Sequence, residues 1–276
     1  MKPRRPDLDF SNLSPHWAAI PEFAQGFNAS SSFIPQLEPF LNRVMVMARA
    51  KIKGDDAASE QLRKDITIFI QQEANHYTLH GAFNSALAKA GYDRLPEFEK
   101  GLGAEFADWL KTKSLKFLTA YCEGFETLGP PYARVWLDEI EDLLVGADKN
   151  VVGLWKWHLL EEYEHRTVCH DVYHRLYGGY FYRIYGLIFQ MRHLGGYSKM
   201  VKKYLLARDR ANMTPDEVAA SIKREKQVGR RLARLALPRL LRAFSPFYTP
   251  RSCPEPKMFR DYMAKVEAGL AKQASA

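Results

Sequence analysis

The sequence contains two Glu-x-x-His motifs, Glu73 to His76 and Glu162 to His165. Successive residues of an α-helix are rotated by about 100°, so residues three apart lie on one face and can direct a carboxylate and an imidazole at one point. A single such pair is common on helix surfaces. Two pairs on facing helices would supply half of the ligands of a dinuclear metal site.

Carboxylates for the other half lie upstream of both motifs. Glu38 lies 35 residues before Glu73, while Glu126 and Glu123 lie 36 and 39 residues before Glu162. Ferritin-like di-iron and di-manganese bundles use this order, with one Glu on each of two helices and Glu-x-x-His on each of the other two. The sequence therefore predicts a dinuclear site. The alternative is that these side chains are solvated, or are buried histidines bonded to neighbouring acids.

Other polar residues near the motifs are candidates for further roles. His80, seven residues after Glu73, is a candidate third histidine ligand, and Cys169 occupies the corresponding position after Glu162. Cys169 also fits a small buried apolar residue. The first half of the site could therefore contain one more histidine than the second.

Glu161 and His158 flank the second motif, and we take them as candidate catalytic residues. A metal-bound histidine normally donates its other ring N–H to a carboxylate or carbonyl, so Glu161 and Asp171 are also candidate partners for the ligand histidines.

Four carboxylates with two imidazoles form a hard donor set. We expect two metal ions, with iron favoured and manganese or zinc as alternatives. Structural zinc would use more cysteine, and the three cysteines, Cys122, Cys169 and Cys253, form no Cys-x-x-Cys pair. We expect them to be free thiols.

Three functions suit such a site. A di-iron centre could oxidise a small apolar substrate with O2, which makes an oxidoreductase our first expectation. A metal-dependent hydrolase using metal-activated water is the alternative, and a non-catalytic metal-binding protein is the third. The aromatic segment Tyr180 to Phe189 suits either a core helix or the wall of an apolar substrate cavity.

The composition, 46% hydrophobic and 26% charged, is typical of a globular protein. No apolar run reaches the roughly 18 to 20 residues of a membrane span, and the N-terminus has no secretory signal pattern. We expect a cytoplasmic protein. A homodimer is compatible with the sequence.

The apolar periodicity predicts an all-α fold. We expect helices at about 38–51, 57–90, 103–128, 132–145 and 148–177, with Pro39 placing Glu38 at a helix start or a kink. Three regions follow: an extended arm over 1–30, a ferritin-like four-helix bundle with additional helices over 31–200, and a basic helical extension over 201–276 packed on the bundle.

The basic charge is concentrated in the extension. Residues 201–276 contain 17 Lys and Arg against 7 Asp and Glu, and Thr214 to Glu217 is a helix-start signal ahead of a basic amphipathic helix. Such a surface suits peripheral contact with an anionic membrane or an acidic partner protein. No nucleic-acid-binding motif accompanies the charge, so nucleic acid is not an expected partner.

Residues 30 to 200 resemble the bacterial family of predicted metal-dependent hydrolases, which has a ferritin-like helical character. The resemblance rests on three segments: Phe33 to Glu38, Phe69 to His76, and Trp155 to His165. It implies hydrolysis. It also implies five metal ligands: Glu38, Glu73, His76, Glu162 and His165.

The family pattern of the third ligand helix, Leu-Thr-Ala before a Glu, matches Leu118 to Ala120 and favours Glu123 over Glu126. The chain departs from the pattern twice. Gly124 stands where the family has a histidine, and His170 stands where it has an aromatic residue.

Overall fold

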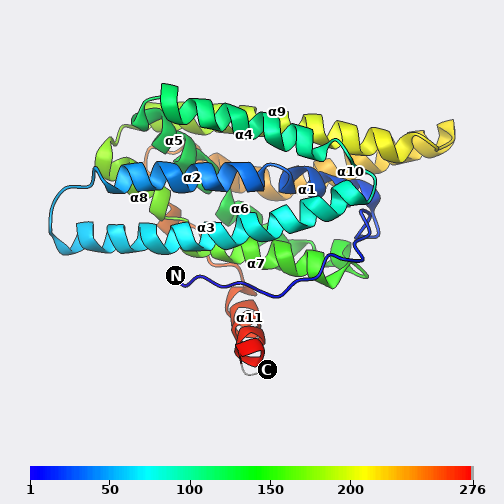
Figure 1. The fold of residues 1–276 in the computed structure, drawn as a ribbon, viewed down its shortest axis with the longest axis horizontal. Helices are drawn as coiled ribbons and strands as arrows, with labels where there is room; N and C mark the ends of the chain where they lie inside the picture. Colours follow the sequence, from blue (N-terminus) through cyan, green and yellow to red (C-terminus); the bar gives the residue numbers. More distant parts are fainter. Residues whose placement is uncertain (275–276) are drawn as a thin grey trace.

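The computed structural model describes residues 1–274, and all regular secondary structure in that range is helical, as predicted (Figure 1). Four helices carry the predicted ligands: α2 (Ile34–Arg49), α3 (Ala57–Lys89), α5 (Leu115–Glu126) and α7 (Lys149–His165). The described residues form seven more α-helices: α1 (Pro21–Ser31), α4 (Leu95–Thr112), α6 (Gly129–Arg134), α8 (Val168–Leu176), α9 (Tyr180–Arg210), α10 (Pro215–Leu240) and α11 (Phe259–Ala274), the last of which projects away from the others.

Side-chain caps fix the start of three of the ligand-bearing helices. The carboxylate of Asp56 accepts a hydrogen bond from the backbone N–H of Ser59 at the start of α3. The Ser114 hydroxyl and the Asp148 carboxylate play the same part for α5 and α7. Each cap satisfies amide groups that the first turn leaves without a partner. The start of each helix, and hence the position of its ligands, is thereby set locally.

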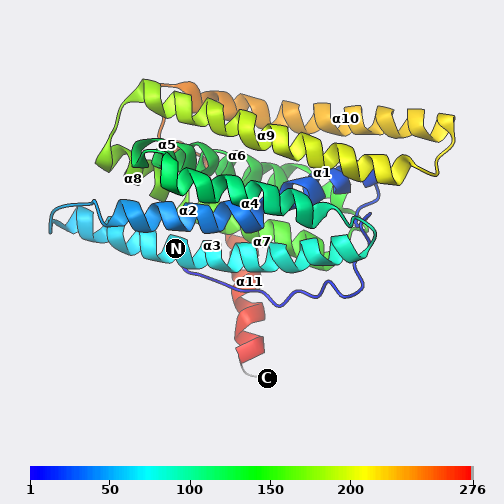
Figure 2. The same cartoon turned by 45° about the horizontal axis from the view of Figure 1, so that its top comes forward.

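The ligand-bearing helices pack around an apolar core. Helix α2 lies along α3 and also contacts α5, and α3 packs on α7. Leu37, Phe69, Leu118 and Leu154 are fully buried between them. In Figure 2, α9 and α10 form an outer layer over this central group.

Three predicted elements differ from the structure near the N-terminal half. The arm predicted over 1–30 is extended only at its beginning, because Pro21–Ser31 forms α1. Helix α2 begins at Ile34 with Pro35 in its first turn, so Pro39 lies inside the helix and Glu38 is one turn from the start. The helix predicted over 103–128 is two helices, since Ser114 adopts an extended conformation as the cap of α5.

The helices predicted over 132–145 and 148–177 also differ from the structure. The helix predicted over 148–177 breaks after His165, and α8 begins at Val168. The predicted helix over 132–145 is replaced by α6, a π turn at Val135–Glu139 and a 3-10 turn at Glu141–Leu144. The second ligand motif therefore sits in the last turn of α7.

Helices α5 and α9 approach each other closely. A Cβ at Gly186 would lie 2.6 Å from the carbonyl oxygen of Ala120, and a Cβ at Gly124 would lie 2.9 Å from the Cα of Leu187. Both distances are too short for a side chain. This contact leaves no room at position 124 for the histidine that the resemblance led us to expect.

The aromatic segment Tyr180 to Phe189 forms the first turns of α9. Its inward face packs on α5, while Phe181 is 85% exposed and Tyr185 is half exposed. A further 3-10 turn, Leu241–Phe244, follows α10, and another lies at Pro250–Ser252. No helix among the described residues is long and apolar enough to span a membrane.

The basic extension is attached to the bundle by ion pairs. The predicted start of α10 has the expected capping box between Thr214 and Glu217. Along this helix, Arg224 pairs with Glu22 of α1 at 2.8 Å. Arg231 pairs with Asp142 at 2.6 Å, and Arg239 pairs with Glu139.

The close contact of α5 and α9 predicts a stability difference between two glycines of α9. Gly186→Ala should destabilise the protein by about 1–3 kcal/mol, because the new methyl group overlaps the α5 backbone. Gly195→Ala should stabilise it by about 0.5–1 kcal/mol, since a Cβ there meets nothing within 4 Å. Urea unfolding of both variants measures the difference. Equal effects would contradict the assigned packing.

Candidate metal centre

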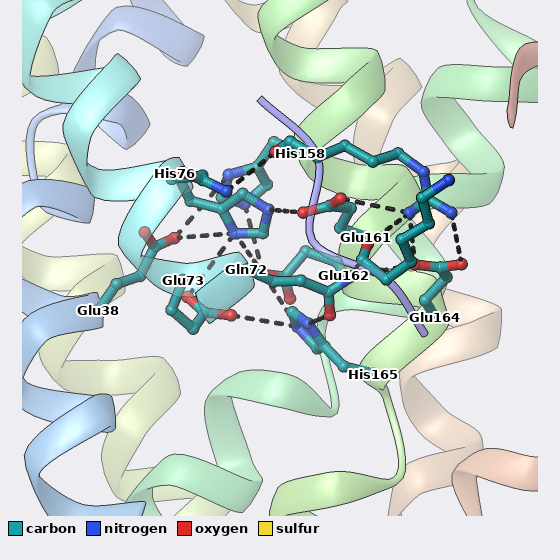
Figure 3. Close-up of polar contacts among 12 residues, drawn as sticks. Glu38, Gln72, Glu73, His76, His158, Glu161, Glu162, Glu164 and His165 are labelled. Carbon is teal, nitrogen blue, oxygen red and sulfur yellow. Dashed lines mark hydrogen bonds and ion pairs between the residues drawn. The ribbon is translucent and has the colours of Figure 1, made fainter. Parts of the chain in front are cut away.

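Seven ionisable side chains from four helices converge between α2, α3, α5 and α7, and Figure 3 labels all of them except Glu126. None is more than 3% exposed to solvent. They are Glu38 of α2, Glu73 and His76 of α3, Glu126 of α5, and His158, Glu162 and His165 of α7.

These side chains form two groups that could each hold a metal ion. One contains Glu38, His76, His158 and Glu162, and the other contains Glu73, Glu126, Glu162 and His165. Within each group, the candidate ligand atoms lie within 4.8 Å of one another. Glu162 belongs to both, so the two groups adjoin.

Two carboxylates span the groups. Glu73 directs Oε2 toward His76 Nδ1 at 3.7 Å and Oε1 toward His165 Nε2 at 3.2 Å. Glu162 Oε1 lies 3.9 Å from His76 Nδ1 and 3.4 Å from His165 Nε2. Glu162 belongs to both groups and Glu73 faces a histidine of each, so either carboxylate could be shared by two ions.

The inward-facing atoms of the cluster have no hydrogen-bond partner in the structure. Among them are both carboxylate oxygens of Glu38, Glu73 and Glu126, together with His76 Nδ1 and His165 Nε2. Buried polar atoms are almost always paired, so such a concentration of unpaired acceptors is suited to binding cations. The residues present fit a pair of metal ions.

The pKa values of the carboxyl groups also indicate that the cluster is suited to binding cations. Burial raises the pKa of Glu38 well above its usual range, and the neighbouring Glu73 and Glu162 raise it further. Burial, followed by the charge of Glu162, raises the pKa of Glu126 to about 8. Burial opposes ionisation of Glu162 as well, but the nearby histidines, His165 foremost, lower its pKa to about 2. A cation would stabilise all of these carboxylates in their charged form.

The outer nitrogens of two histidines are held by neighbouring side chains. His76 Nε2 lies 3.2 Å from Glu161 Oε2, and His165 Nδ1 lies 3.1 Å from Gln72 Oε1. An acceptor at the outer nitrogen directs the lone pair of the other nitrogen into the site. As neutral ligands, His76 would thus present Nδ1 to a metal ion and His165 would present Nε2.

The structure places Glu126, and not Glu123, in the cluster, against the preference drawn from the family pattern. The carboxylate of Glu123 pairs instead with Arg183 at 3.3 Å and with His170 at 3.1 Å. This buried ion pair belongs to the contact between α5, α8 and α9. It explains the histidine at position 170, which serves as a partner of Glu123.

Three other candidates also lie outside the cluster. His80 Nδ1 is hydrogen-bonded to the Ser31 hydroxyl at 2.8 Å. Cys169 is buried on α8, with its thiol 3.8 Å from the sulfur of Met45. Asp171 forms an ion pair with Arg251 at 2.5 Å at the surface.

His158 enters the cluster as a ligand candidate, whereas the sequence suggested a catalytic role. Its Nε2 lies 3.5 Å from Glu162 Oε1, and its Nδ1 lies 3.8 Å from Glu38 Oε1. Burial and the neighbouring His76 hold the pKa of His158 well below its usual range, which favours the neutral, metal-binding form. The signal in the sequence was its spacing, four residues before Glu162 and so on the same helix face.

A dinuclear arrangement of Glu and His within a set of helices is typical of metal-dependent proteins, and comparison with known families agrees with that class. The family described as "Predicted metal-dependent hydrolase" matches residues 2–253. This chain belongs to that family. No curated protein and no solved structure matches the chain.

Substitution of the two α5 carboxylates should separate metal binding from stability. We expect Glu126→Gln to lose at least one bound metal ion per chain, because it removes an anionic ligand from one group. Glu123→Gln should retain its metal but lose about 3–5 kcal/mol of stability, because Arg183 is left buried without its partner. Elemental analysis and urea unfolding of both variants provide the test. Metal loss in Glu123→Gln alone would reverse the assignment.

Proposed function

We propose that this protein is a dinuclear metal enzyme that uses iron or manganese to oxidise a small, apolar organic substrate with O2. One observation carries the proposal: two buried groups of Glu and His ligands share Glu162, and Glu73 directs one carboxylate oxygen toward each. Carboxylates in this position hold two ions side by side.

The donor set supports a redox-active metal. Four carboxylates make the cluster a hard, anionic donor set, which suits iron and manganese. Structural zinc sites contain more thiolate or histidine ligands. The order of ligands along the chain is that of ferritin-like di-iron bundles, with which the helix arrangement is compatible. Complete burial also excludes bulk water, which limits side reactions during oxidation.

Each residue of the site has a definite part in this proposal. Glu38 and Glu126 would each hold one ion, since they belong to different groups, and Glu73 and Glu162 would be shared by both ions. When bound, two iron or manganese ions would supply electrons for the reduction of O2. Glu161 keeps the His76 ring in one orientation.

Hydrolysis is the second candidate, and the description of the family favours it. In that case the bound metal would lower the pKa of a water molecule toward neutrality. The ligand residues would be unchanged. The two functions differ in the metal they require and in whether O2 is consumed.

The first test is the metal itself. Protein expressed with added iron, manganese and zinc should contain close to two ions per chain, with iron or manganese preferred. Anaerobic protein loaded with Fe(II) should consume O2 on exposure to air, and Glu73→Gln should not. Elemental analysis, an oxygen electrode and near-ultraviolet absorption provide the measurements.

The outcomes separate the alternatives. Two zinc ions, no O2 uptake and cleavage of model esters would favour hydrolysis. Many more than two irons per chain would indicate storage. Absence of stoichiometric metal under all these conditions would refute the dinuclear site.

A further inference from the structure

The N-terminal segment lies against the two helices that carry the Glu-x-x-His motifs. The Gln72 side-chain amide donates to the carbonyl oxygen of Lys2 at 3.1 Å, and the Asn75 amide donates to that of Arg4 at 3.1 Å. Both donors belong to α3, within three residues of a ligand. Residues 2–5 therefore form a strap over the outer side of the metal centre.

The side chain of Arg4 points inward from this strap and is only 3% exposed. Its guanidinium pairs with Glu161 at 3.3 Å and with Glu164 at 2.8 Å, both on α7. It also pairs with Glu267 of α11 at 3.0 Å. One cation thus joins three carboxylates and both ends of the described chain.

Arg4 is connected to both ligand histidines through one or two side chains. Glu161 accepts from Arg4 with Oε1 and contacts His76 Nε2 with Oε2. On the other side, Glu164 Oε2 accepts from Arg4 and from Gln72 Nε2, and Gln72 Oε1 contacts His165 Nδ1. Figure 3 shows Glu161 on the side of the His76 ring opposite to Glu38.

The charge of Arg4 decides the direction of these hydrogen bonds. Beside a guanidinium, Glu161 is an anionic acceptor, so His76 must donate from Nε2 and keep Nδ1 free for a metal. Because Gln72 donates its amide protons to Glu164 and Lys2, its oxygen faces His165 and accepts from Nδ1. His165 then keeps Nε2 free.

We propose that Arg4 is a positioning residue that fixes the orientation of both ligand histidines from outside the metal centre. This inference rests on the proposed dinuclear site. The fork geometry of arginine is needed because one group must reach Glu161, Glu164 and Glu267 together, which a lysine ammonium cannot do in the same way.

Arg4→Gln tests this role, with Arg5→Gln as the matched control, since Arg5 is the adjacent arginine and is exposed. Protein loaded with Co(II) has a visible spectrum that reports the ligand arrangement. Arg4→Gln should alter that spectrum and release Co(II) to a chelator about 10- to 100-fold faster, the range typical of groups that support metal ligands. Arg5→Gln should match the native protein.

The possible outcomes are distinct. Native-like release and spectrum in Arg4→Gln would overturn the role of Arg4 while leaving the dinuclear site intact. Failure of the native protein to bind Co(II) would instead count against the proposed function; ¹⁵N NMR of the His76 and His165 rings in metal-free protein would then decide, with unchanged shifts in Arg4→Gln overturning the role. If Arg4→Gln does not fold, Arg4→Lys and Arg5→Lys replace the pair, and equal Co(II) release rates overturn the proposal.

A second inference comes from the outer face of α10. The arginines of this helix that face the bundle form ion pairs, whereas four bases on the outward face have no acidic partner among the described residues. These outward bases are Lys223, Lys226, Arg230 and Arg234. Within one helix, one set of basic residues holds the structure together and the other faces solvent.

Apolar side chains lie beside these outward bases. Leu237 is 51% exposed and falls on the same helix face, Leu241 follows one turn later, and Phe247 is 90% exposed beyond it. Outward bases followed by exposed Leu and Phe suit a bilayer surface, where cations meet anionic headgroups and apolar side chains enter the interface.

We infer that the outward face of α10 binds anionic lipid surfaces. The full-length protein should sediment with vesicles containing phosphatidylserine but not with pure phosphatidylcholine, and added salt should weaken the binding. Lys226→Glu/Arg230→Glu should reduce binding at least tenfold. The control Lys64→Glu/Lys100→Glu changes the net charge equally on other exposed surfaces and should retain binding.

Equal losses in both double variants would show attraction by net charge alone and would overturn the assigned face. Binding of Leu237→Ser equal to that of the native protein would show that the bases alone bind the vesicles and would overturn the part assigned to the apolar side chains. No binding of the native protein to either vesicle would overturn the lipid assignment.

Discussion

The structure is organised around the repulsion between carboxylates that lie close together without solvent. Glu38, Glu73, Glu126 and Glu162 are within one cluster and almost fully buried. Charges of the same sign are costly in a buried site, and burial together with the neighbouring carboxylates raises the pKa values of Glu38 and Glu126. Two cations would remove the repulsion. The helices therefore form a site whose stability depends on what it binds.

The surroundings of the cluster can be understood from the same constraint. Because the ligands face inward, their supporting groups must lie behind them, on the outer turns of α3 and α7. Each of the two motifs has one supporting side chain behind its histidine. The two supports differ, because a carboxylate contacts His76 and an amide contacts His165. The two ions would consequently have different environments, since an anionic acceptor makes a histidine a stronger donor to metal.

Spacing alone predicted the helical fold and brought Glu38, Glu73, His76, Glu162 and His165 to one place, because a ligand pair three residues apart fixes a helix face. It could not choose between Glu123 and Glu126, which are three residues apart on the same helix and differ by about 4.5 Å along its axis. The choice depends on Arg183, sixty residues away in sequence. Arg4 was missed for a similar reason: nothing near it in the sequence resembles a site. The placing of Glu123 outside the cluster and of Arg4 beside it both depend on contacts between residues far apart in the sequence.

The pairing of Arg4 with Glu267 limits when the strap can be completed during synthesis of the chain. These residues are separated by 263 positions, so their contact cannot form until nearly all of the described chain has left the ribosome. The four ligand-bearing helices are complete by His165. A nascent chain would therefore pass through a stage in which the ligands are assembled but the strap is not yet held by α11. During that interval the outer side of the proposed metal centre would not yet be fixed by the contact with α11.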